Sequence, residues 1–259
     1  MSASENHAGS LAEAHSTRDS ASQIARATLG LRELLLQGAF RPGQRIAEIP
    51  LSAKLGVSRT PLRLAFEKLE HEGLVHAIAH SGFAASEFTL TDIWDAIETR
   101  GILEGAAARI AAERLKDPAQ LDPLRKINRA MEGMQASDVE SFERYLDLNE
   151  TFHVAILELA NNKILRRAVE QIYRFPFASM SSRVLHSKTV QGSKELLPIA
   201  EEHHRALIDA IEHREGARAE SLAREHSRIT RRNLEVALAN RTFLETVPGA
   251  GLIKLRSVD

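Results

Sequence analysis

The segment 56–66, Gly-Val-Ser-Arg-Thr-Pro-Leu-Arg-Leu-Ala-Phe, restricts the possible folds of this chain more than any other stretch. Ser58 can cap a helix that begins directly after it, and Pro61 lies in the first turn, where its missing N–H costs little. Arg59 and Arg63 are four residues apart and therefore share one helix face. The buried stripe has helical spacing and consists of Leu62, Ala65, Phe66 and Leu69. We expect a short anchored helix that presents two arginines at its start.

Short elements on either side of this helix complete a small domain. A helical apolar pattern begins at Ser22 and ends at Gly38, and a second, short helix stops at Gly56. Short apolar runs flank residues 79–82, and Gly82 suits the tip of a β-hairpin. Three short helices followed by a hairpin predict a winged helix-turn-helix.

The charge distribution agrees with a DNA-binding function for this domain. The whole chain has 34 basic and 35 acidic residues, a net charge of −1, which alone argues weakly against a nucleic-acid binder. Residues 22–86, however, hold eight bases and five acids, so this segment carries +3 and the rest of the chain −4. A basic N-terminal segment on a mildly acidic body fits a DNA reader attached to a second domain.

The rest of the chain is predicted to be mainly α. No strand signal follows Glu87, and helical patterns cover roughly 89–115, 121–135, 138–160, 163–187, 194–214 and 217–240. Pro176 predicts a kink, and the helices together predict an antiparallel bundle. The expected organisation is a disordered tail (1–20), the winged helix-turn-helix domain (21–87), an all-helical domain (88–240) and a loose C-terminal tail (241–259).

Composition excludes several classes of protein. The chain has no cysteine, which rules out disulfides, thiolate metal sites and a cysteine nucleophile. Its longest uncharged run, Gly73–Ser86, is shorter than the roughly 20 apolar residues that a membrane span needs. The first twenty residues lack the apolar region of a signal peptide. We expect a soluble, cytoplasmic protein.

The expected bundle places polar residues on its inward stripes. His204 has the helical spacing of its apolar neighbours, His226 does so on the next helix, and Asn149 and His153 lie one turn apart on an earlier helix. Neutral imidazoles suit zinc, nickel, cobalt or iron, and an amide oxygen can complete the ligand set. The alternative is that each histidine is a core residue satisfied by a local hydrogen bond. Arg100 and Glu104 are also on an inward stripe, as either a structural ion pair or an anion site.

Four stretches closely resemble the DNA-binding domain of GntR-family transcriptional regulators: 37–46, 51–55, 56–63 and 72–74. The resemblance implies that Arg59 and Arg63 contact operator bases and that Gly82 contacts the minor groove. The expected DNA-binding residues are Lys54, Ser58, Arg59, Thr60, Arg63, His80 and Gly82. Ile49 departs from the pattern, because some relatives have a further DNA-contacting arginine there.

Residues 89–238 resemble the all-helical FCD effector domain of the FadR subgroup. Metal-binding members carry Asp-x-x-x-His on one helix and one histidine on each of two later helices, which implies Asn149, His153, His204 and His226 as ligands of a divalent ion such as zinc or nickel. Asn149 stands where aspartate is usual. Arg100 matches a residue that lines the effector pocket, so the expected effector-binding residues are Arg100, Glu104, Asn149, His153, His204 and His226.

These features together predict a metabolite-responsive regulator and not an enzyme. A single helix-turn-helix covers one half-site, so we expect a homodimer on near-palindromic operator DNA, with a small organic acid as effector. Regulators of this kind usually repress. The alternatives are a metal-free pocket whose histidines bind the effector, an all-helical metalloenzyme acting on a small carboxylic acid, and an architectural DNA-binding protein without effector.

Overall fold

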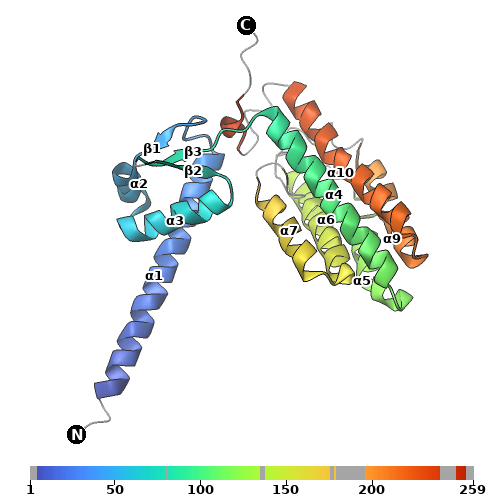
Figure 1. Cartoon of the computed structure of the whole chain (residues 1–259), viewed down its shortest axis with the longest axis horizontal. Coiled ribbons are helices and arrows are strands. Elements are labelled where there is room, and N and C mark those ends of the chain that lie inside the picture. The colour runs from blue at the N-terminus through green and yellow to red at the C-terminus, as the bar shows by residue number, and fades with distance from the viewer. Residues whose placement is uncertain are drawn as a thin grey trace. The chain divides into compact units, whose positions relative to one another are not determined.

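The computed structural model describes residues 5–79, 81–134, 138–175, 178, 196–239 and 249–254 (Figure 1). The chain divides into two compact units, residues 1–88 with 251–259 and residues 89–250. Each unit is described by itself. Within the described ranges, no helix has both the length and the apolar character that crossing a bilayer requires.

The N-terminal unit combines three helices with a small antiparallel sheet. Its elements are α1 (Glu5–Leu36), β1 (Arg45–Ile46), α2 (Glu48–Leu55), α3 (Arg59–His71), β2 (Val75–Ile78) and β3 (Gly82–Ala85). The strand order is β1-β3-β2, and Arg45 pairs with Ala84. Phe66 of α3 is fully buried, and its ring stacks on Phe83 of β3 with centroids 4.6 Å apart. This arrangement confirms the predicted winged helix-turn-helix.

The turn between α2 and α3 sets the start of the second helix. Gly56 adopts the left-handed conformation with φ of 61°, and the N–H of Val57 returns to the carbonyl of Ser52. Ser58 is the N-cap residue of α3, as expected, but its side chain makes no capping hydrogen bond. Gly82 has φ of +85° at the start of β3, where a residue with a Cβ would be strained.

Both ends of the chain differ from the predicted tails. The backbone is helical from Glu5, because residues 5–20 contain several good helix formers and no proline and continue directly into the buried part of α1. At the other end, Ile253 forms a parallel bridge with Phe88, and the N–H of Lys254 donates to the Phe88 carbonyl at 2.8 Å. Leu252 is fully buried, so this stretch is held in place by apolar packing. Residues 241–248 and 255–259 lie outside the described ranges.

The second unit is the predicted all-helical bundle. It contains α4 (Leu90–Arg114), the 3-10 turn η1 (Pro118–Leu121), α5 (Asp122–Met131), α6 (Val139–Ala160), α7 (Lys163–Arg174), α9 (Leu197–Glu212) and α10 (Gly216–Ala239); the short η2 (Ala250–Leu252) follows. Thr89 and Asp92 form the expected capping box at the start of α4. The kink expected at Pro176 lies outside the described residues.

Helix α4 is the central helix of the bundle and packs against α6, α7, α9 and α10. Its closest neighbour is α10, which runs beside it in Figure 1. Gly101 and Gly105 permit this approach: a Cβ on Gly101 would clash with the Ser227 side chain, and one on Gly105 would lie 2.9 Å from Arg224 Cγ and 3.0 Å from the Glu220 carbonyl. The close contact brings the inward residues of α10 next to those of α4.

Candidate metal centre and nucleic-acid interface

The start of α3 and the β2–β3 hairpin, which is the wing of the domain, line one hollow on the N-terminal unit. Arg63 is well exposed, and its Nε lies 3.3 Å from Glu48 Oε2. The Glu48 carboxylate also lies beside the start of β3, with Oε1 3.7 Å from the place a Cβ on Gly82 would take. The hollow is lined by Arg45, Ile46, Ala47, Glu48, Ile49, Pro50, Arg59, Arg63, Ser81 and Gly82.

The structure thus brings together three of the residues expected to bind DNA, Arg59, Arg63 and Gly82. Lys54, Ser58 and Thr60 are exposed nearby but do not line the hollow, and His80 lies outside the described residues. The sequence prediction missed Arg45 as part of this surface. Its strand has only two residues and no readable pattern, and the pairing of Arg45 with Ala84 is what brings it to the wing.

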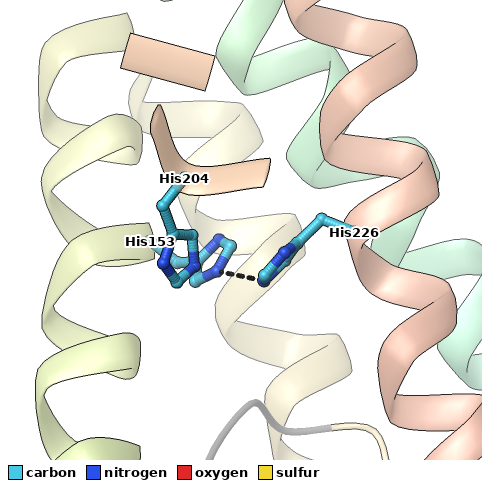
Figure 2. Close-up of side chains that lie close together, drawn as sticks. All are labelled: His153, His204 and His226. Carbon is cyan, nitrogen blue, oxygen red and sulfur yellow. Dashed lines mark hydrogen bonds between the residues drawn. The ribbon is translucent and has the colours of Figure 1, made fainter. Parts of the chain in front are cut away.

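The second site is a cluster of three histidines inside the bundle. His153 of α6, His204 of α9 and His226 of α10 are 3%, 0% and 4% exposed. Each ring offers one nitrogen such that all three atoms lie within 4.8 Å of one another. Figure 2 shows the rings converging from different helices, with Nε2 of His153 3.2 Å from Nε2 of His226. The helical spacing places each ring inward, and the bundle brings them together.

The cluster has the protonation state that metal ligands need. Burial lowers the pKa of His153 to about 3, and the nearby Arg100 charge adds to this effect. Burial also holds the pKa values of His204 and His226 well below the usual range, and the neighbouring imidazoles contribute. All three rings are therefore neutral at pH 7, and each neutral ring has one nitrogen lone pair.

The residues present fit a divalent ion on two further observations. Two nitrogens bound to one tetrahedral zinc at 2.0–2.1 Å would be about 3.3 Å apart, close to the 3.2 Å between the two Nε2 atoms. Within the described part of the chain, both ring nitrogens of His204 and Nδ1 of His226 have no hydrogen-bond partner although they are buried. Asn149 is also buried, one turn before His153 on α6. Core histidines satisfied by local hydrogen bonds would not leave these nitrogens unpaired.

Arg100 and Glu104 of α4 lie next to the cluster as a buried pair. The guanidinium is fully buried and donates to the carbonyls of Ala178 and Ser227 and to Thr230 Oγ1. Its Nε is 3.7 Å from Glu104 Oε1. The terminal nitrogens are thus engaged by the protein, and an effector would have to compete with these groups for Arg100.

Glu104 has an uneven environment. Its Oε1 accepts a hydrogen bond of 2.6 Å from Tyr173 of α7, while Oε2 has no hydrogen-bond partner in the described ranges and lies 3.9 Å from His153 Nδ1. Burial raises the pKa of the carboxyl group, opposed by the Arg100 charge and the Tyr173 hydroxyl. The sequence prediction missed Tyr173, because nothing in local periodicity indicates that α7 reaches this carboxylate.

Comparison with known proteins decides the family. The profile described as bacterial regulatory proteins, gntR family, matches residues 23–84, and that of the FCD domain matches residues 95–228. The chain belongs to the GntR family and carries an FCD domain. This confirms the resemblance found in the sequence.

Curated relatives of this GntR-family protein are named as regulators. It is 37% identical over 133 residues to the Nta operon transcriptional regulator of Aminobacter aminovorans, a match that covers 51% of this chain and 61% of the relative. It is 27% identical over 218 residues to the galactonate operon transcriptional repressor of Escherichia coli, covering 76% and 90%. The matches to the first two relatives span 61% and 62% of their lengths. These names agree with the expectation of a regulator and not an enzyme.

Solved structures support the fold of this GntR-family chain. The structure of Lar, which controls expression of the Listeria monocytogenes agr system, matches with a TM-score of 0.59 at 22% identity, over 82% of this chain and 97% of that one. The E. coli protein McbR/YncC matches with a TM-score of 0.54 at 22% identity, over 83% and 96%.

Proposed function

We propose that this protein is a DNA-binding transcriptional repressor, and that a small carboxylate bound at or near a divalent metal site in its FCD domain changes its affinity for operator DNA. The main observation that supports a metal and effector site is the convergence of three buried, neutral histidines with unpaired nitrogens. The family and the names of the relatives support the role of a DNA-binding transcriptional repressor.

The N-terminal unit would bind DNA through the front of α3 and the wing. Arg59 and Arg63 are exposed there, and a guanidinium can donate to O6 and N7 of one guanine or to a phosphate. Gly82 at the wing has no side chain to keep the backbone away from the minor groove. Arg63 also forms an exposed ion pair with Glu48, with Nε 3.3 Å from Oε2. One such unit covers a half-site, so we propose that a homodimer binds a near-palindromic operator.

The metal site would consist of His153, His204 and His226, with the amide oxygen of Asn149 as a fourth ligand. Zinc and nickel both suit imidazole. A divalent ion held by four neutral ligands would supply its full charge to an anion, which favours a carboxylate effector. One relative is named for a galactonate operon, and galactonate is itself a carboxylate. The rival is a metal-free pocket in which the histidines hydrogen-bond the effector.

The first test distinguishes the metal site from the metal-free pocket. It uses the full chain, purified without a histidine tag. We expect close to one equivalent of zinc or nickel per chain after reconstitution, and a rise in melting temperature with a subset of small carboxylates when metal is present. Ligand linkage sets the scale at about 2.7 kcal/mol for a concentration a hundred times the dissociation constant. Stabilisation by carboxylates without any bound metal would support the metal-free pocket, and no stabilisation under either condition would overturn effector sensing.

The second test concerns DNA. Selection from random duplexes should yield a near-palindromic site, and the carboxylate that stabilises the protein should change its affinity for that site. A protein that binds all duplexes equally would contradict the proposal that it recognises a specific operator.

A further inference from the structure

Glu104 is a buried carboxylate beside the histidine cluster, and its two oxygens have different surroundings. Tyr173 donates a hydrogen bond of 2.6 Å to Oε1, and Arg100 Nε approaches the same oxygen at 3.7 Å. Oε2 has no hydrogen-bond partner among the residues that the structure describes, although Glu104 is only 4% exposed. An unpaired buried carboxylate oxygen is costly unless a donor can reach it. Among the described residues, the imidazole beside Oε2 is that of His153, with Nδ1 3.9 Å away.

The protons on the rings limit how the cluster can bind a metal. A neutral imidazole has one N–H and one lone pair. Nε2 of His153 faces Nε2 of His226 at 3.2 Å, so one of these two atoms is the donor in a hydrogen bond. If both are to become ligands, both must offer lone pairs, and the proton of each ring must then be on Nδ1. A metal therefore requires an Nδ1–H on His153, directed to the side where Glu104 lies.

We infer that Glu104 is a positioning residue: it accepts the Nδ1–H of His153 and thereby presents Nε2 of that ring to the metal. The inference rests on the proposed metal site and deepens it, and it gives Glu104 a role other than the contact with effector expected from the sequence. The carboxylate does not touch the metal or the effector in this arrangement. The gap needs to close by about 1 Å to reach hydrogen-bond length.

The neighbours of Glu104 suit this role. Tyr173 donates a hydrogen bond to Oε1 and the Arg100 charge lies 3.7 Å from the same oxygen, which leaves Oε2 for the imidazole. His153 is also distinct among the three ligands: in the described part of the chain, no carboxylate oxygen lies within 4.0 Å of His204 or His226. A carboxylate behind a ligand histidine fixes its tautomer and makes it a better ligand, and losing such a partner weakens metal binding by about 10- to 100-fold.

The test compares Glu104→Gln with Glu98→Gln in the untagged full chain. Both changes remove a carboxylate from α4, but Glu98 is exposed. Zinc affinity is measured by competition with a chelating dye. We expect Glu104→Gln to bind zinc about 10- to 100-fold more weakly and Glu98→Gln to bind like the wild type. Nitrogen-15 NMR of the rings supplies a readout that a purely structural role would not change: in metal-free protein, His153 should be an Nδ1–H tautomer in the wild type and a mixture of both tautomers in Glu104→Gln.

The outcomes separate this inference from the proposed function. Wild-type protein that binds no zinc overturns the metal site and this inference with it. Zinc-binding wild type with unchanged affinity in Glu104→Gln overturns the inference alone. Should Glu104→Gln not fold, as judged by melting of the metal-free protein, Tyr173→Phe takes its place, because it keeps both charges and removes only the hydroxyl that holds Oε1. We then expect a loss of about tenfold, at the low end of the range, and unchanged affinity would overturn the inference.

Discussion

The arginines of the N-terminal unit lie at the surface on top of an apolar core, whereas the histidines of the bundle are themselves part of the core. Arg63 is 68% exposed, so it can be replaced without disturbing the packing below it. His204 is fully buried with both ring nitrogens unpaired, so its chemistry and the stability of the fold are coupled. A site that reads a large partner can add side chains to a finished fold, but a site for a small ligand must be enclosed by the fold.

The largest expected effect is a pH dependence specific to the bundle. The pKa values of His153, His204 and His226 are lower in the folded chain than in the unfolded chain, so the unfolded chain takes up protons first as the pH falls. The contribution of these histidines to the free energy of unfolding is therefore fully present above pH 6.5. It is lost as the pH falls towards their pKa in the folded chain. For His153 that value is about 3. Each histidine that stays neutral should lower the unfolding free energy by about 1.4 kcal/mol per pH unit below 6.5.

Denaturant unfolding of chelator-treated protein between pH 7 and pH 4.5 measures this slope. Arg100 and Glu104 face the cluster, and the buried Arg100 cation adds to the penalty for protonating the rings. A bundle transition with no dependence on pH in this window would show that the rings are hydrated and not enclosed.

The second prediction concerns the core beneath the proposed DNA-binding surface at the start of α3. Phe66→Ala should destabilise the N-terminal unit by about 3–5 kcal/mol, because the ring is fully buried and stacked on Phe83. Zinc affinity of the bundle should stay the same. Denaturant unfolding and dye competition measure the two properties, and a parallel loss of zinc binding would contradict the view of two separately built sites.

The third prediction concerns the contribution of Arg59 and Arg63 to operator recognition. Arg59→Ala or Arg63→Ala should cost about 1–3 kcal/mol of discrimination between the selected operator and random DNA if the side chain reads a base. Melting of the protein should not change, because both side chains are exposed. Lys68→Ala is the matched control, an exposed cation near the other end of α3. Equal losses on operator and random DNA would instead assign the arginine to a phosphate.

Local patterns in the sequence predicted the features that depend on a single helix, namely where it begins and which residues face inward. The position of Ser58 before α3, the capping box at Thr89 and the inward placement of His153, His204 and His226 follow from spacing alone. Contacts between distant segments could not be predicted in this way. The hydrogen bond from Tyr173 to Glu104, the pairing of Arg45 with the wing, and the packing of residues 252–254 against Phe88 depend on tertiary structure that no local period encodes. The helix over residues 5–20 likewise continues into the buried part of α1, which the polar, small-residue composition of this segment does not indicate.

The smallest expected effect is also the one that separates the two sites most clearly. His204→Leu should raise the stability of the metal-free protein by about 1 kcal/mol, because it removes two unpaired buried nitrogens and keeps an apolar side chain beside Phe152. The same change should abolish stabilisation by zinc, because a ligand is lost. His213→Leu, at an exposed histidine at the end of α9, should leave the response to zinc unchanged. Arg45, Arg59 and Arg63 of the proposed DNA-binding surface should not behave like His204, because all three are exposed. A metal-free His204→Leu protein that is less stable than wild type would mean that this imidazole is already satisfied, and a retained response to zinc would remove His204 from the ligand set.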